Sequence, residues 1–231
     1  MLLRHAVRAA GLRPVSVAAE RPAAVVQGFD PGLSYGLIAE GAQAVRAGAL
    51  FVASNGDRTI PGGTGGPRPG NGALTEVIQA ATGVRPVVTG KPETPLHRES
   101  ILRTGAQRPL VVGDRLDTDI EGAQKGGADS LLVFTGVTDP LDALTARPQH
   151  RPTYLAPDLS GLLIAHPEVA EDGDARYTCE GWTAARQGAR IELTGDGAPY
   201  DGLRALCAAA WRDAEPPTPD AVRPALARLE L

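Results

Sequence analysis

The stretch from residue 108 to residue 136, RPLVVGDRLDTDIEGAQKGGADSLLVFTG, constrains the fold more than any other part of the chain. Residues 110–112 form an apolar run with the length of a buried strand, and a glycine ends it. A helix capped by Asp117 or Thr118 should follow, and a pair of glycines closes it before residues 131–135 begin the next strand. This order predicts a βαβ unit with the usual right-handed crossover.

Three acidic residues gather where the first of these strands ends: Asp114, Asp117 and Asp119. Ligands of open α/β sheets bind just outside the carboxyl ends of strands, so this loop lies where a site is expected. Neighbouring carboxylates repel one another unless a cation or proton intervenes, and hard oxygen donors without nearby Cys or His pairs suit magnesium. The same residues would also serve as solvated loop acids that cap a helix. The spacing alone leaves both interpretations open.

The residues before this stretch alternate between strand and helix patterns, which indicates the α/β class. After a short helix over residues 2–10, strands are expected at 23–29, 50–53 and 86–89, and helices at 34–47, 72–81 and 94–104. Ser34 is placed to cap the helix expected over residues 34–47. The segment 60–72, IPGGTGGPRPGNG, is so rich in Gly and Pro that no regular structure is expected there.

The pattern continues after the central stretch and then changes near His166. A helix is expected over residues 139–146, followed by a strand at 152–156 and a helix at 158–164. Beyond His166 a hairpin of strands 177–183 and 189–193, joined by 184–188, precedes an amphipathic helix over 203–211. The last segment, 215–231, opens with three prolines and suggests a tether.

Composition excludes several classes of protein. A net charge of −4 gives no electrostatic case for binding nucleic acid or an anionic membrane. No apolar run reaches the roughly 20 residues of a membrane span and no signal peptide stands at the start, so a cytoplasmic protein is expected. Cys179 and Cys207 are far apart, which predicts neither a disulfide framework nor a zinc site. A P-loop is excluded because Pro92 follows Gly90-Lys91.

Lysine is rare, since only Lys91 and Lys125 of the 23 basic residues are lysines. Lys91 follows the strand expected at 86–89, and so lies at the carboxyl end of a strand. A compact ammonium on a flexible stem does what a planar guanidinium cannot, which makes Lys91 a candidate for a charged site. A solvated loop lysine is the alternative.

Five segments together resemble the haloacid dehalogenase-like (HAD) phosphatases. TGKP, GDRLDTDI and GGADSLLVFTGVT resemble the third and fourth motifs of that superfamily. Residues 29–61 and 69–83 resemble the branch with a large α/β cap, which includes phosphoglycolate and 4-nitrophenyl phosphatases. The resemblance spans residues 22–166. It implies an α/β fold in which the C-terminal part of an inserted cap, residues 1–65, precedes a doubly wound Rossmann-like parallel core, residues 66–166. An α+β extension, 167–213, and a Pro-rich tail, 214–231, would complete the chain.

The resemblance also implies roles for particular residues. Asp114 would hold Mg²⁺, Asp119 would support it, and Lys91 would neutralise charge on the phosphate and on an aspartate nucleophile. Asn55 and Asp57 would face the substrate where the cap returns to the core. The expected partner is a small phosphorylated metabolite, and a homo-oligomer formed through the cap would suit the family.

The nucleophile motif of the family, an apolar strand ending in D-x-D-G, is missing from the sequence. Asp117-Thr118-Asp119 belongs to the fourth motif, and Asp172-Gly173-Asp174 follows no apolar strand. We therefore expect a truncated product or a misplaced start codon, with core strands lost between those ending at Thr89 and Val112, and no covalent step. The alternatives are a non-catalytic or partner-dependent fragment that binds phosphate or a metabolite, and, less suited to the order of sites, a receiver-like phosphoacceptor domain.

Overall fold

The computed structural model describes residues 2–173, 175–188 and 190–231. Two predictions touch the other three positions: Asp174 of the second D-x-D pair and Ala189, expected to begin a strand, lie outside the described residues. The chain divides into two compact units, Met1–Ser100 and Ile101–Leu231, called here the first and the second unit. No helix of the described residues is both long enough and apolar enough to cross a membrane.

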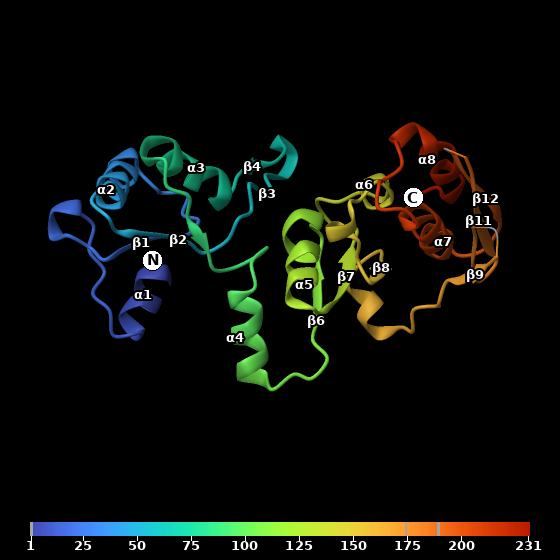
Figure 1. Cartoon of the computed structure of the whole chain (residues 1–231), viewed down its shortest axis with the longest axis horizontal. Helices are drawn as coiled ribbons and strands as arrows, with labels where there is room; N and C mark the ends of the chain where they lie inside the picture. The colour runs from blue at the N-terminus through green and yellow to red at the C-terminus, as the bar shows by residue number, and fades with distance from the viewer. Residues whose placement is uncertain (1, 174, 189) are drawn as a thin grey trace. The chain divides into compact units, whose positions relative to one another are not determined.

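The first unit is built on a parallel sheet of three strands in the order β1-β2-β5 (Figure 1). Its strands are β1 (Ala24–Gln27), β2 (Leu50–Ala53) and β5 (Val87–Val88). The helices α2 (Tyr35–Arg46) and α3 (Asn71–Thr82) pack against each other and cover one face. Ala42, Val45, Phe51 and Ile78 form the apolar core between them. Ser34 caps α2 as predicted, because its hydroxyl accepts the N–H of Leu37.

Three further elements complete this part of the chain: α1 (Leu2–Ala9), a 3₁₀ turn at Ala18–Glu20 and α4 (Pro95–Thr104). The segment 60–72, predicted to lack regular structure, instead begins in a two-stranded ribbon of β3 (Thr59–Ile60) and β4 (Arg68–Pro69). The ribbon encloses a 3₁₀ turn at Gly63–Gly65. Glycines between the two strands allow the tight reversal, and each strand needs only two residues to pair.

The position of β5 differs from the expected division of the chain. The predicted division places residues 86–89 in the core, with a boundary at 65/66, but Val87 pairs with Val52 and Val88 with Ala53. Residues 66–100 therefore fall in the first compact unit. Short strands carry little information about which neighbour they join, because the choice depends on packing far along the chain.

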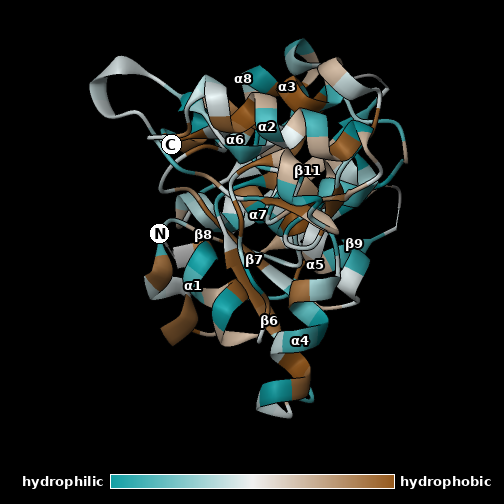
Figure 2. Ribbon diagram, turned by 90° about the vertical axis from the view of Figure 1, so that its left-hand side faces the viewer, coloured by the Kyte–Doolittle hydropathy of each residue, from teal (hydrophilic) through white to brown (hydrophobic). Residues whose placement is uncertain are grey.

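The second unit begins with the predicted βαβ unit. Parallel strands β6 (Leu110–Gly113), β7 (Asp129–Val133) and β8 (Tyr154–Ala156) lie in that order. Figure 2 shows hydrophobic residues along β6 and β7, and those of β7 are buried, as expected for a strand covered on both faces. The unit also contains the helices α5 (Glu121–Gly126) and α6 (Pro140–Leu144), and 3₁₀ turns at Pro148–His150 and Leu159–Leu163. The last of these replaces the helix expected over 158–164.

The predicted cap of α5 is wrong. Asp117 and Thr118 both lie inside a π-helical turn, Leu116–Ile120, which precedes α5 and begins without a side-chain cap. The N–H groups of Asp119 and Ile120 both donate to the carbonyl of Arg115, so the turn is wider than an α-helical one. Ile120 is completely buried as a result. Packing of this side chain decides the local winding, and capping propensity does not.

Beyond residue 166 an antiparallel sheet forms in the order β12-β11-β10-β9. Its strands are β9 (Ala170–Asp172), β10 (Arg176–Cys179), β11 (Trp182–Gln187) and β12 (Arg190–Gly195). The residues 184–188, predicted to join two strands, lie mostly within β11. One reversal instead occurs at Glu180-Gly181, where Glu180 has a positive φ of 49°. Ala184 is completely buried, which explains why this part of β11 belongs to the sheet.

The C-terminal segment is not a tether. It forms α8 (Pro219–Leu226) and a 3₁₀ turn, Ala227–Leu229, that bury Val222, Ala225 and Leu229. Pro219 lies in the first turn of α8, where a missing N–H costs nothing. The prolines therefore mark the start of a helix, and the predicted Pro-rich tail over 214–231 is wrong for residues 219–229.

The helix α7 (Pro199–Trp211) joins the two sheets of the second unit into one apolar core. Leu132 and Leu155 of the parallel sheet belong to the same buried cluster as Trp182 of β11 and Leu206 of α7. Polar contacts reinforce the junction, since the indole of Trp211 donates to the carbonyl of Ala143 at 3.0 Å. Within the second unit, the residues after 166 thus share an apolar core with the strands and helices that precede residue 166.

Candidate functional site

Two strands of the first unit bring the predicted residues Asn55, Asp57 and Lys91 together. β2 and β5 are parallel neighbours, so their carboxyl ends open at the same edge of the sheet. The turn after β2 carries Asn55 and Asp57, and the turn after β5 carries Lys91. The two turns are joined directly, because the N–H of Gly56 donates to the carbonyl of Lys91 at 2.9 Å.

Their side chains form a small charged cluster. The amide of Asn55 donates to Oδ2 of Asp57 at 2.9 Å, and Nζ of Lys91 lies 3.6 Å from the same oxygen. Asp57 is buried, whereas the side chain of Lys91 is 35% exposed. The carboxylate of Asp57 therefore lies beside an ammonium that is partly exposed to solvent.

Sequence reasoning missed Asn71, which anchors this cluster. Asn71 is only 1% exposed, and its amide donates to the carbonyl of Asn55 at 3.0 Å and to that of Gln27 at 3.4 Å. The adjacent N–H of Gly72 donates to the carbonyl of Asp57 at 2.8 Å, and a Cβ at Gly72 would collide with the carbonyl of Gly56. The only sequence signal was an Asn between two glycines at a helix start, which ordinarily indicates a cap.

The second unit places Asp114 directly after β6. One oxygen of its carboxylate, Oδ2, accepts the N–H of Val137 at 3.1 Å, and its carbonyl accepts the N–H of Thr138 at 3.1 Å. A side chain at Gly136 would collide with this carboxylate, so glycine is required for the close approach. Among the described residues Oδ1 of Asp114 makes no protein hydrogen bond that would compete with a cation.

Asp119 has a different environment, five residues further along. It is 8% exposed, and Oδ2 accepts the backbone N–H of Arg115 at 3.2 Å. The guanidinium of Arg115 in turn holds both oxygens of Asp117, at 3.1 and 2.9 Å. Asp119 and Asp117 therefore brace the loop that presents Asp114.

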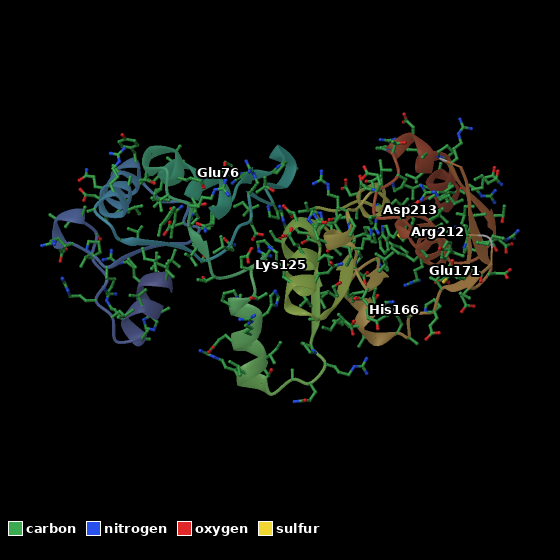
Figure 3. The ribbon with its side chains drawn as sticks, in the orientation of Figure 1. Glu76, Lys125, His166, Glu171, Arg212 and Asp213 are labelled. Carbon is green, nitrogen blue, oxygen red and sulfur yellow. The ribbon has the colours of Figure 1, made fainter. Side chains whose placement is uncertain are left out.

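The other lysine, Lys125, lies on α5 (Figure 3) and belongs to an ion-pair network. Its Nζ lies 2.8 Å from Glu121, four residues earlier on the same helix, and His150 contacts the other carboxylate oxygen at 2.9 Å. Burial raises the pKa of Glu121, but the hydrogen bonds and charges of Lys125 and His150 outweigh burial and leave that pKa below its ordinary value. Lys125 thus supports a helix.

The described residues contain no group of three or more His, Cys, Asp or Glu side chains that could enclose a metal ion. Magnesium does not need such a cage, because it retains several waters and binds through one or two carboxylates and the phosphates of a substrate. Oδ1 of Asp114, at a strand end, is a hard oxygen donor of the required kind. The residues of the second unit therefore fit one magnesium ligand.

Comparison with known proteins decides the family. A family model described as HAD-hydrolase-like matches residues 88–162. D-glycerol 3-phosphate phosphatase of Mycobacterium tuberculosis is 49% identical over 160 residues, which make up 69% of this chain and 45% of that protein. The crystal structure of glycerol phosphate phosphatase from Mycobacterium tuberculosis in complex with magnesium has a TM-score of 0.80 at 39% identity, covering 98% of this chain and 69% of that chain. The chain belongs to the HAD-like hydrolase family.

This HAD-like hydrolase also resembles a 5′-nucleotidase of Bacillus subtilis, with 41% identity over 138 residues, 59% of this chain and 52% of that protein. The chain spans about half the length of the curated relatives it matches. The family and the α/β fold with a cap, both predicted from the motifs, are confirmed. A second family model, a GCN5-related N-acetyltransferase like domain, matches residues 179–231 and was not predicted.

Proposed function

We propose that this HAD-like hydrolase is part of a magnesium-dependent phosphatase for small phosphomonoesters. The observation that carries the proposal is the cluster of Lys91, Asp57 and Asn55 at adjoining strand ends. Phosphoryl transfer spreads negative charge over three oxygens, and a positioned ammonium with a metal ion is what stabilises it. The named activities of the relatives, on glycerol phosphate and on nucleotides, support the same class of substrate.

Each predicted site residue has a task in this proposal. Lys91 binds a phosphate oxygen, and Asp57 holds the ammonium in place through Oδ2. Asp114 supplies an oxygen ligand to Mg²⁺, and Asp119 holds the backbone of the Arg115 loop so that Asp114 keeps its position. Bound magnesium would polarise the phosphoryl oxygens. Asn55 orients Asp57 through its amide, and its predicted place facing the substrate stays a proposal.

We further propose that the residues of this sequence do not supply the nucleophile. In the D-x-D pair within the described residues, Asp117 is held by the Arg115 guanidinium and Asp119 by the Arg115 backbone. Neither is free to attack phosphorus without breaking the loop that holds Asp114. The chain by itself is therefore expected to bind phosphate without turning over.

The test combines binding and activity in the purified chain. With Mg²⁺ and inorganic phosphate, the melting temperature should rise, because a ligand that binds only the folded state stabilises it. The rise should vanish in Lys91→Ala and persist in Lys125→Ala, which removes the other lysine of the chain. No rise in the wild type would refute the phosphate site.

Activity decides the second claim. We expect no hydrolysis of 4-nitrophenyl phosphate above the rate without protein. Turnover that disappears in Asp114→Ala would show that the nucleophile assignment is wrong. The genomic DNA upstream of the first codon provides an independent check, since an in-frame D-x-D-G after an apolar strand would supply the attacking aspartate in a longer product.

A second candidate is a phosphate-binding or metabolite-binding fragment that works with a partner carrying further strands. It is favoured by sheet edges: within the described residues β1 and β6 each pair on one side only. It predicts the same binding without turnover, and turnover once the partner is added. A cytoplasmic location and a homo-oligomer formed through the cap remain predictions.

A further inference from the structure

The amino-terminal end of α3 connects to Lys91 through hydrogen bonds from one side chain and two backbone N–H groups. Asn71 donates to the carbonyl of Asn55, and Gly72 donates to that of Asp57. The turn is thereby held at both of its ends. Gly56, between them, donates to the carbonyl of Lys91 at 2.9 Å.

The side chain of Asn71 is placed to do more than cap its own helix. An N-cap side chain accepts N–H groups of its first turn, but Asn71 is the first helical residue and its amide donates away from the helix. Its two acceptors are the carbonyl of Gln27, the last residue of β1, and the carbonyl of Asn55, in the turn after β2. Asn71 therefore ties two strand ends to one helix.

The hydrogen bonds of Asn71 also affect the position of the Asp57 carboxylate, which lies beside Lys91. Asp57 is buried and receives the amide of Asn55, so its direction depends on the turn that Asn71 and Gly72 hold. If the carbonyl of Asn55 lost its buried donor, the turn would relax to find another hydrogen bond. Both Asp57 and the backbone of Lys91 would move with it.

We propose that Asn71 is a positioning residue for the Lys91 ammonium, acting through the turn Asn55–Asp57. Its importance for phosphate binding rests on the function proposed above; its effect on the position of Lys91 does not. The proposal differs from a general contribution to stability, because it predicts a specific change at one side chain.

The two lysines of the chain provide the readout. Reductive methylation with ¹³C-formaldehyde keeps the positive charge and labels only Lys91, Lys125 and the amino terminus. Lys91→Arg assigns the Lys91 signal, and the Lys125 signal serves as an internal reference because Lys125 and its partner Glu121 both lie on α5.

The variant Asn71→Ala should shift the Lys91 methyl signal and leave the Lys125 signal unchanged. The matched control is Ile78→Val on the same helix, which creates a small cavity in the core and leaves the contacts of Asn71 intact. Asn71→Ser, which keeps one donor, should give an intermediate shift, and it serves if the alanine variant does not fold. A Lys91 signal that matches the wild type in both Asn71 variants, or that shifts equally in Ile78→Val, would overturn the proposal.

Inorganic phosphate is the second probe. It should move the Lys91 signal of the wild type, with about tenfold more phosphate needed in Asn71→Ala, because a misplaced ammonium loses a charge-assisted hydrogen bond. No response in the wild type would refute the proposed phosphate site, whereas the signals without phosphate would still decide the role of Asn71. Equal phosphate affinity in wild type and Asn71→Ala would overturn the importance of Asn71 for phosphate binding.

Discussion

The shared apolar core of the second unit makes a sharp prediction about how this unit unfolds. Leu206 of α7 and Leu132 of β7 are both completely buried in it, 74 positions apart in the sequence (206 − 132). Truncation of a fully buried leucine to alanine costs about 2–5 kcal/mol, from lost transfer free energy and the cavity that remains. Because both side chains lie in one core, Leu206→Ala and Leu132→Ala should each destabilise the parallel and the antiparallel sheet together.

Tryptophan fluorescence during urea unfolding measures this directly, since Trp182 and Trp211 are the only tryptophans and both contact this core. For a slope of about 2–3 kcal/mol per M, each variant should lower the midpoint by about 1–2 M. The control is Leu163→Ala, whose side chain is 87% exposed, with an expected change of about 0.5 kcal/mol or less. If Leu132→Ala left the tryptophan transition unmoved, the residues after 166 would fold separately and the shared core would be refuted.

Three further predictions follow from local contacts. Glu121 has a pKa below its ordinary value of 4.5, so its stabilisation is complete above pH 4.5 and is lost as the pH falls through the lower folded value; urea midpoints between pH 6 and 3 should fall less steeply in Glu121→Gln than in the wild type. Burial raises the pKa of Cys179 to about 11 and also raises the pKa of Cys207, so neither thiol should react with Ellman's reagent at pH 8 until urea unfolds the protein; fast reaction of the folded protein would contradict their burial. Asp139 and Asp142 form a reciprocal capping box at the start of α6, so Asp139→Ala should cost about 1 kcal/mol and Asp139→Asn much less, as measured by thermal unfolding; equal losses would show that the charge of Asp139 matters more than its hydrogen bond.

Local signals predicted the parts of the fold that local physics decides. The residues 50–53 form a strand as expected, and Ser34 caps α2 because a hydroxyl before an apolar periodic run has one favourable use. The strand-end rule predicts that Lys91 and Asp114 each lie at the carboxyl end of a strand, and the family resemblance adds Asp57. The structure brings Lys91 and Asp57 together.

The missed features depend on residues that are distant in the sequence. The π-helical turn exists because Ile120 packs into a core that α7 completes. Nothing in the sequence of residues 116–120 predicts that α7 will pack there. The prolines of residues 215–231 predict a tether, because the sequence does not show the core that buries Val222 and Leu229. The sequence does not reveal the role of Asn71, because its acceptors, the carbonyls of Gln27 and Asn55, are distant from it in the sequence.

The two lysines show that the contacts of a residue, and not its type, distinguish a candidate binding residue from one that stabilises a helix. Each ammonium lies beside a carboxylate, at 3.6 Å for Lys91 and 2.8 Å for Lys125. Lys125 and Glu121 lie on one turn of helix, where such a pair contributes a few tenths of a kcal/mol and needs no other structure. Lys91 meets Asp57 because β2, β5 and the start of α3 converge, and backbone hydrogen bonds from Gly56 to Lys91 and from Gly72 to Asp57 join them. An ammonium held by the fold in this way is pre-organised for an anion, since little freedom remains to be lost on binding.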